Sequence, residues 1–173
     1  MSTRVFSRLF LFLTLVFVQT LILCQVRLFG YCMPLLLVYY LVLTPSHQPR
    51  VISVLEGFLL GLCMDMSLNT PGMGAAAMTL TAFVNPYILG LTAEPDKLED
   101  DFVPSSLIMG WGSFMLYGGM LTTVFAVAYF LIEWFSFAHV QGLLLNIVGS
   151  LLLTLPLFAA VELIHRKMAT TKS

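Results

Sequence analysis

Four acidic residues of this chain lie within or at the ends of strongly apolar stretches. They are Glu56, Asp65, Glu133 and Glu162. An ionised carboxylate in hydrocarbon is costly, so each must face protein, reach an interface or be protonated, and each is by default a functional candidate. Glu56 and Asp65 are candidate contacts for a partner. For Asp65 two alternatives stay open: it has a specific polar partner, or it simply meets headgroup water or caps the turn. Glu133 and Glu162 are expected to be solvated at an interface.

These acids do not match the arrangement of catalytic residues in a known intramembrane enzyme. An aspartyl signal peptidase needs two facing aspartates, and Asp65 is the only aspartate in a predicted helix. A rhomboid-type protease needs a GxSG serine and a helix-borne histidine, whereas the histidines here lie in loops or at helix ends. We therefore expect no enzyme, no catalytic residue and no cofactor. The histidines are His47, His139 and His165.

The cysteines also lack a pattern that would indicate metal binding. There is no CxxC pair and no histidine at ligand spacing, so we interpret them as thiols buried in lipid or in protein and predict no metal site. The cysteines are Cys24, Cys32 and Cys63.

Two glycines precede Asp65 at helical spacing. Gly57 and Gly61 form a GxxxG pair on one helix face. Such a pair lets a second backbone approach closely, because dispersion must replace the hydrophobic drive that is missing within lipid. The spacing predicts a helix-packing face that ends at Asp65.

The residues after Asp65 predict a tight helical hairpin. A polar reversal over residues 67–69 leads into Thr70 and Pro71, where Thr70 is expected to cap the next helix and Pro71 suits its first turn. Gly72, Gly74 and the alanines at 75–77 keep the start of that helix narrow. We expect the two backbones to pack closely at this end.

The elements that position these residues must be membrane-spanning helices. The chain has 173 residues, 59% of them apolar and only 10% charged. Its mean hydropathy of +0.95 is too high for a water-soluble domain of this size. Since each pass needs roughly 20 apolar residues, the length accommodates about six passes and no separate soluble domain. We predict an all-α integral membrane protein with a single domain over residues 1–173.

Six apolar runs are bounded by charged, polar or proline residues. The second and third runs would reach only roughly 24 and 21 Å as helices. They must extend into their flanks, thin the bilayer or lie against neighbours. The first run is too long for a signal peptide and has no A-x-A cleavage site, so we interpret it as a transmembrane helix. The predicted helices are 5–26, 29–44, 51–65, 71–91, 107–132 and 142–164.

Six passes place both termini on one side, and the basic residues indicate that this side is cytoplasmic. Arg27 alone would lie on the other side. The longest connection, residues 93–106, holds five acids and one lysine, and is either a solvated loop or a docking surface for a basic partner. The formal net charge of -1 and the scattered basic residues argue against nucleic-acid binding. The basic residues assigned to the cytoplasm are Arg4, Arg8, Arg50, Lys97, Arg166, Lys167 and Lys172.

The segment from Gly57 to Gly74 resembles the hallmark segment of the rod shape-determining protein MreD family. The resemblance rests on Gly57-x-x-x-Gly61-x-x-x-Asp65, a short polar reversal and Thr70-Pro71-Gly72-x-Gly74. Outside residues 56–77 the similarity is mostly hydropathy. The T-P-G-M form and the acidic loop look most like MreD of the Bacteroidetes group. One departure is Gly74, where the family commonly has histidine before the alanine run.

The resemblance implies a non-enzymatic scaffold of the bacterial cell-elongation machinery, which directs lateral peptidoglycan synthesis and maintains rod shape. It implies an inner-membrane location, with membrane lipid around it and MreC as partner. Through MreC it would associate with MreB, RodA and a class B penicillin-binding protein. The implied fold is similar to the substrate-binding subunits of energy-coupling-factor transporters. A vitamin-binding importer subunit is therefore the alternative function.

Overall fold

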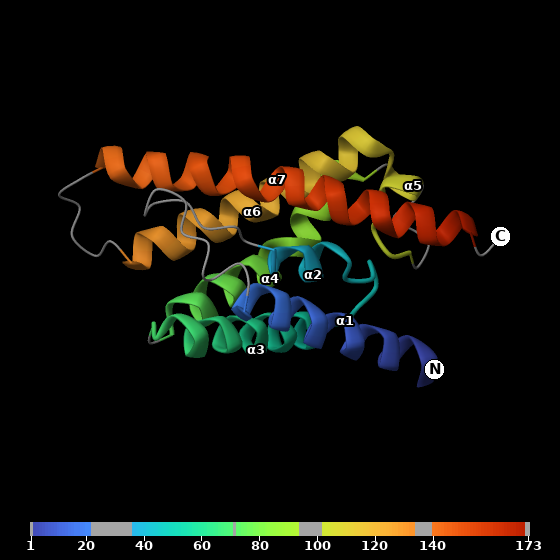
Figure 1. The fold of residues 1–173 in the computed structure, drawn as a ribbon, viewed down its shortest axis with the longest axis horizontal. Helices are drawn as coiled ribbons and strands as arrows, with labels where there is room; N and C mark the ends of the chain where they lie inside the picture. Colours follow the sequence, from blue (N-terminus) through green and yellow to red (C-terminus); the bar gives the residue numbers. More distant parts are fainter. Residues whose placement is uncertain (1, 22–35, 71, 94–101, 134–139, 172–173) are drawn as a thin grey trace.

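The computed structural model describes residues 2–21, 36–70, 72–93, 102–133 and 140–171 (Figure 1). Every regular element in these ranges is a helix, as the apolar composition predicts. The helices are α1 (Ser2–Leu21), α2 (Val38–Val42), α3 (Arg50–Leu68), α4 (Met73–Thr92), α5 (Ser106–Met109), α6 (Trp111–Glu133) and α7 (Val140–Thr171).

The two runs that looked too short to span a membrane adopt different structures. The third extends at its carboxyl end to form α3, whose 19 residues correspond to about 28 Å of helix. The second forms only the five-residue helix α2 in its described part, and all five residues are buried. In the described part of the predicted continuous helix over 29–44, only Val38–Val42 is helical, and residues 29–35 lie outside the described ranges.

The predicted helix over 107–132 is also divided. α5 stops at Met109, and Gly110 adopts φ 83° and ψ 154° before α6 begins. A left-handed φ of this kind is accessible to glycine at no steric cost, so Gly110 allows the sharp change of direction. The polar residue Ser105 precedes α5 in an extended conformation.

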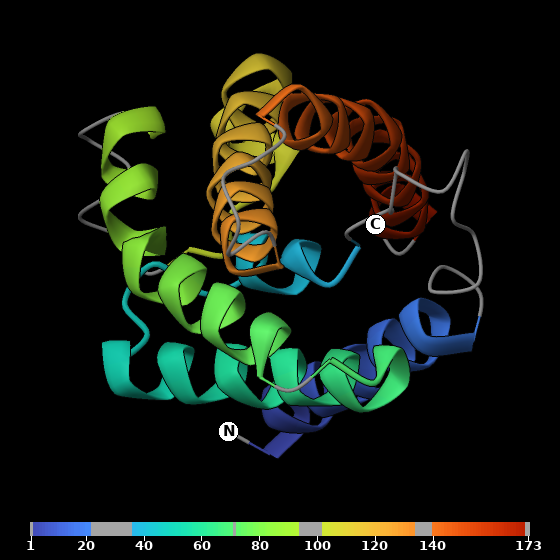
Figure 2. The same ribbon diagram turned by 90° about the vertical axis from the view of Figure 1, so that its left-hand side faces the viewer.

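The helices form two groups, which are joined by the packing of α4 against α6 and have α2 between them. α6 and α7 lie side by side along the long axis, and α3 pairs with α4 and α1 below them (Figure 1). The view along that axis shows α2 between α6 and the α1–α3 pair (Figure 2). α2 contacts α1, α4 and α6, so it is an internal element of the described structure.

Side-chain burial separates an aromatic interior from an apolar exterior. Tyr39, Phe114, Tyr117, Phe125 and Phe158 are almost completely buried. Large apolar side chains remain exposed on α1, α3, α4, α6 and α7, as is expected where lipid is the solvent. Within the described ranges, three helices are long and apolar enough to cross a membrane: Arg50–Leu68, Met73–Thr92 and the Trp111–Ile132 part of α6. These features indicate a helical membrane protein.

Candidate functional site

The predicted hairpin is formed by α3, α4 and the turn between them. α3 continues one turn beyond Asp65 and ends at Asn69, which adopts the left-handed φ of 55°. Asparagine tolerates this conformation better than other non-glycine residues. The N–H groups of Asn69 and Thr70 donate to the Asp65 carbonyl. Gly72, with φ 81°, then leads into α4, and Pro71 lies outside the described residues.

Asp65 caps the amino terminus of α4 from the neighbouring helix. Its Oδ1 accepts from the Gly74 N–H at 2.7 Å and its Oδ2 from the Ala75 N–H at 2.9 Å. These N–H groups belong to the first turn of α4 and have no partner within the helix. A carboxylate there also interacts favourably with the positive end of the helix dipole. Asp65 therefore joins the end of α3 to the start of α4.

The prediction that Thr70 caps α4 is wrong. α4 begins at Met73 rather than at residue 71, and its N-cap is Gly72, which has no side chain. The Thr70 hydroxyl instead donates to Asp65 Oδ1 at 2.7 Å. Asp65 is 5% exposed, so it does not lie in headgroup water. It caps the turn and the start of α4, and capping of the turn was part of the plainer alternative. The Asp65 carboxylate has two acceptor oxygens, so it accepts from the Thr70 hydroxyl and from both N–H groups at once.

The glycines of the hairpin lie where the two helices are closest. A Cβ added to Gly61 would lie 2.4 Å from the Gly74 carbonyl oxygen and 2.5 Å from Ala75 Cα. At Gly57 it would lie 2.8 Å from Ala82 Cβ. A Cβ on Gly74 would lie 2.8 Å from Asp65 Oδ1. The structure thus brings Gly57, Gly61, Asp65 and Gly74 together along one helix–helix interface.

Glu56 lies in a different cluster, between α1 and α3. Its Oε2 accepts from Arg8 Nη2 at 2.8 Å and from Gln48 Nε2 at 2.9 Å. Arg8 also donates to Gln48 Oε1, and its guanidinium lies 5.6 Å from the centre of the Tyr40 ring. Both charged side chains are partly exposed. Glu56 is therefore separate from the Asp65 site.

The expected interfacial solvation of Glu162 is wrong. Glu162 is completely buried, and its carboxylate accepts from the Tyr39 hydroxyl at 2.9 Å and from the Ser106 N–H at 2.8 Å. Tyr39 of α2 and Ser106 at the start of α5 both reach Glu162 on α7, which hydropathy does not reveal. The side chain of Glu133 lies outside the described part of the chain.

Further buried polar residues were missed by the sequence reasoning. Asn85 on α4 donates to the Leu41 carbonyl at 2.9 Å and accepts from the Tyr117 hydroxyl. Gln19 on α1 accepts from the Leu36 N–H at 3.0 Å. The available signal was a polar amide side chain within an apolar run, which usually needs a partner inside the protein.

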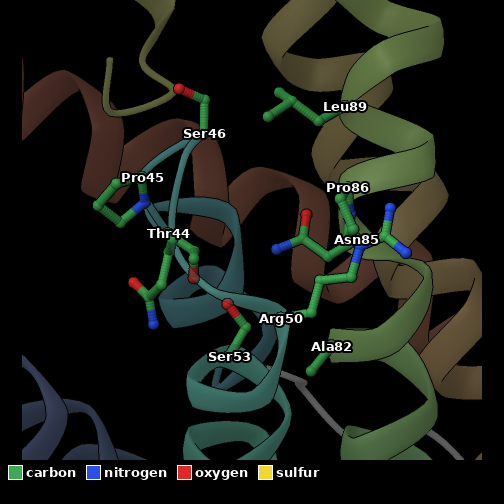
Figure 3. A pocket seen from close by; sticks show the side chains of 10 residues that line it. Thr44, Pro45, Ser46, Arg50, Ser53, Ala82, Asn85, Pro86 and Leu89 are labelled. Carbon is green, nitrogen blue, oxygen red and sulfur yellow. The ribbon is translucent and has the colours of Figure 1, made fainter. Parts of the chain in front are cut away.

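A small pocket adjoins Asn85 where Pro86 interrupts the hydrogen bonding of α4 (Figure 3). Proline has no N–H, so the Ala82 carbonyl loses its usual helical donor. Thr44, also on the wall, has a buried hydroxyl with no partner among the described residues. The cavity measures about 20 Å³, which is room for one water molecule.

The site chemistry is that of helix packing and capping. Among the residues that the structure describes, no three His, Cys, Asp or Glu side chains are grouped so that they could hold a metal ion. Cys63 is a partly exposed free thiol, and Cys24 and Cys32 are outside the described ranges. Comparison with known proteins adds no assignment: no family model, curated protein or solved structure matches the chain.

Proposed function

We propose that this protein is a non-enzymatic membrane scaffold of the bacterial cell-elongation machinery, related in role to MreD. The proposal includes six passes, a location in the inner membrane, cytoplasmic termini and a fold like that of the energy-coupling-factor binding subunits. It also includes MreC as the direct partner and MreB, RodA and a class B penicillin-binding protein as further members of the complex.

The observation that carries the proposal is the Asp65 cap across the α3–α4 hairpin. Asp65 accepts three hydrogen bonds from the turn and the start of α4, and Gly61 brings the two backbones together. Five of the residues that carry the MreD resemblance therefore help to hold the two helices in one fixed relation. They are Gly57, Gly61, Asp65, Thr70 and Gly74. A rigid helical pair is what a scaffold needs in order to present a constant surface to a partner.

The outer face of α3 supplies such a surface. Val51, Phe58 and Met66 recur at helical spacing and are exposed, with Met66 85% accessible. An exposed apolar stripe on a membrane helix contacts lipid or another helix. In the proposed complex it receives the single transmembrane helix of MreC, since helix association within lipid depends on close packing.

Deletion in a rod-shaped host tests the scaffold function. We expect cells that lack the protein to become round during rapid growth, and unchanged cell width would overturn the proposal. Co-purification from detergent with a bitopic, coiled-coil MreC-like partner tests the assembly separately. Replacement of Phe58 by Ala should weaken that capture without loss of folded protein.

The alternative is a vitamin-binding subunit of an energy-coupling-factor importer. The observation that favours it is a pocket of about 600 Å³ beside Arg8 and Tyr40, which is within the usual size range of small-molecule sites. Equilibrium binding of a vitamin to the purified protein, together with an ATPase partner, would favour this function over the scaffold.

A further inference from the structure

We infer that the pocket between α1, α3 and the 45–49 loop binds one bilayer phospholipid with an ethanolamine headgroup. The pocket measures about 600 Å³ and is partly open. It does not involve Asp65 or the glycines of the hairpin, so the inference is independent of the scaffold function.

Besides His47, the polar wall of the pocket carries one positive and one negative group. Arg8 and Glu56 form an ion pair at 2.8 Å, with side chains 31% and 23% exposed, and both line the pocket. Arg8 alone would favour an anionic headgroup, but Glu56 cancels its charge. The wall therefore has no formal net charge but presents both a positive and a negative group.

A phosphoethanolamine group has matching chemistry. The guanidinium has five N–H donors, of which Gln48 Oε1 and Glu56 Oε2 accept one each, so it can also bind a phosphate oxygen. Arg8 and Gln48 donate to Glu56 Oε2, and the Tyr40 hydroxyl also lies within hydrogen-bonding reach of this carboxylate. The two carboxylate oxygens offer about four lone-pair sites, so the ligand ammonium can donate to them as well. Charge-assisted contacts of this kind are stronger than neutral ones.

The rest of the pocket is suited to an acyl chain. Phe12, Tyr40, Ile52 and Leu59 contribute apolar surface to the lining. Ile52 and Leu59 lie seven residues apart on α3 and are each 46% exposed. They extend the pocket along the helix for about 10 Å, from the polar end near Gln48 toward the hairpin. A soluble headgroup would leave this apolar surface unused, so we assign a lipid rather than a free phosphate compound.

The test uses the full chain in detergent and native mass spectrometry to count retained lipids. Phosphatidylethanolamine, phosphatidylglycerol and phosphatidylcholine of equal chain length are offered separately. We expect phosphatidylethanolamine to be retained about tenfold more strongly, equivalent to about 1.4 kcal/mol. Phosphatidylcholine lacks N–H donors and phosphatidylglycerol lacks a cation, so equal retention of all three would overturn the assignment.

Two substitutions and one control localise the binding. Leu59→Trp should fill the apolar part of the pocket and reduce retention about tenfold. Leu55→Trp changes an exposed leucine of the same helix that is outside the lining, and should leave retention unchanged. Glu56→Gln should reverse the preference toward phosphatidylglycerol, because Arg8 then acts without a neighbouring anion. If Leu59→Trp retains lipid as well as Leu55→Trp, the pocket is not the site.

Competition identifies any other occupant. Glycerophosphoethanolamine has the headgroup without chains, and we expect it not to displace the lipid at equal concentration. Displacement by this compound or by a vitamin would show that the pocket takes a soluble ligand, and would overturn the lipid assignment. Neither result would change the shape phenotype that tests the scaffold.

Discussion

The α3–α4 hairpin is fixed by contacts between residues close in sequence. Asp65 caps residues nine and ten positions later, and Gly61 meets Gly74 and Ala75. The α2 segment, residues 36–44, is held from distant parts of the chain: by Gln19 on α1, Asn85 on α4 and Glu162 on α7. The hairpin can therefore form as a local unit, whereas the position of α2 depends on contacts from α1, α4 and α7.

The Gly61→Leu substitution should have the largest effect, because it acts on backbone atoms. Even the first atom of the new side chain would lie 2.4 Å from the Gly74 oxygen, so α4 must move away. We expect a loss of about 3 kcal/mol or more and little folded protein in the membrane. Accumulation and unfolding in detergent measure this, with Gly90→Leu as control because Gly90 has open space around it. Equal accumulation of the two variants would contradict the close packing of α3 and α4 in the hairpin.

Asp65→Ala should have the second-largest effect. It leaves the Gly74 and Ala75 N–H groups buried without their acceptor, at a cost of about 2–3 kcal/mol. Hydrogen exchange should increase at the start of α4 and remain unchanged in the α2 segment. Asp65→Asn is the matched control, since it keeps one acceptor oxygen and should lose about half as much stability. A uniform increase in exchange would contradict the description of the hairpin as a local unit.

Tyr39→Phe tests the α2 segment. It removes one donor from buried Glu162 and keeps the ring against Phe158, so we expect a loss of about 1.5 kcal/mol. Exchange should increase in α2 while the hairpin keeps its protection. Combination with Asp65→Ala should be additive within about 0.5 kcal/mol, and strong coupling would show that the two regions do not behave independently.

Arg50→Gln should have the smallest effect. Arg50 is exposed at the start of α3, where its guanidinium lies 5.1 Å from the centre of the Tyr87 ring. An exposed contact of this type contributes about 0.5 kcal/mol. The free energy of unfolding in detergent should therefore barely change. A loss of stability as large as that of Tyr39→Phe would reveal a role for this end of α3 that neither region explains.

The hairpin part of the site could be predicted from the sequence, because the residues that indicate it lie close together in the chain. The Gly57–Gly61 spacing predicted a close helix contact, and the polar reversal after Asp65 predicted the turn. The capping residue was misassigned to Thr70, because α4 starts two residues later than expected and a carboxylate on the preceding helix reaches its first N–H groups. Even within a hairpin, a shift of two residues changes which side chain is in reach.

Composition and apolar run lengths alone determined that the chain is helical and has helices fit to cross a membrane, because lipid demands internal hydrogen bonding and long apolar segments. Tertiary structure decided that α2 is buried, that Gly110 divides α5 from α6, and that Glu162 lies in the interior with Tyr39. Hydropathy describes whether each segment prefers lipid or water. It does not describe which polar groups, up to 123 positions apart, find each other once the helices pack.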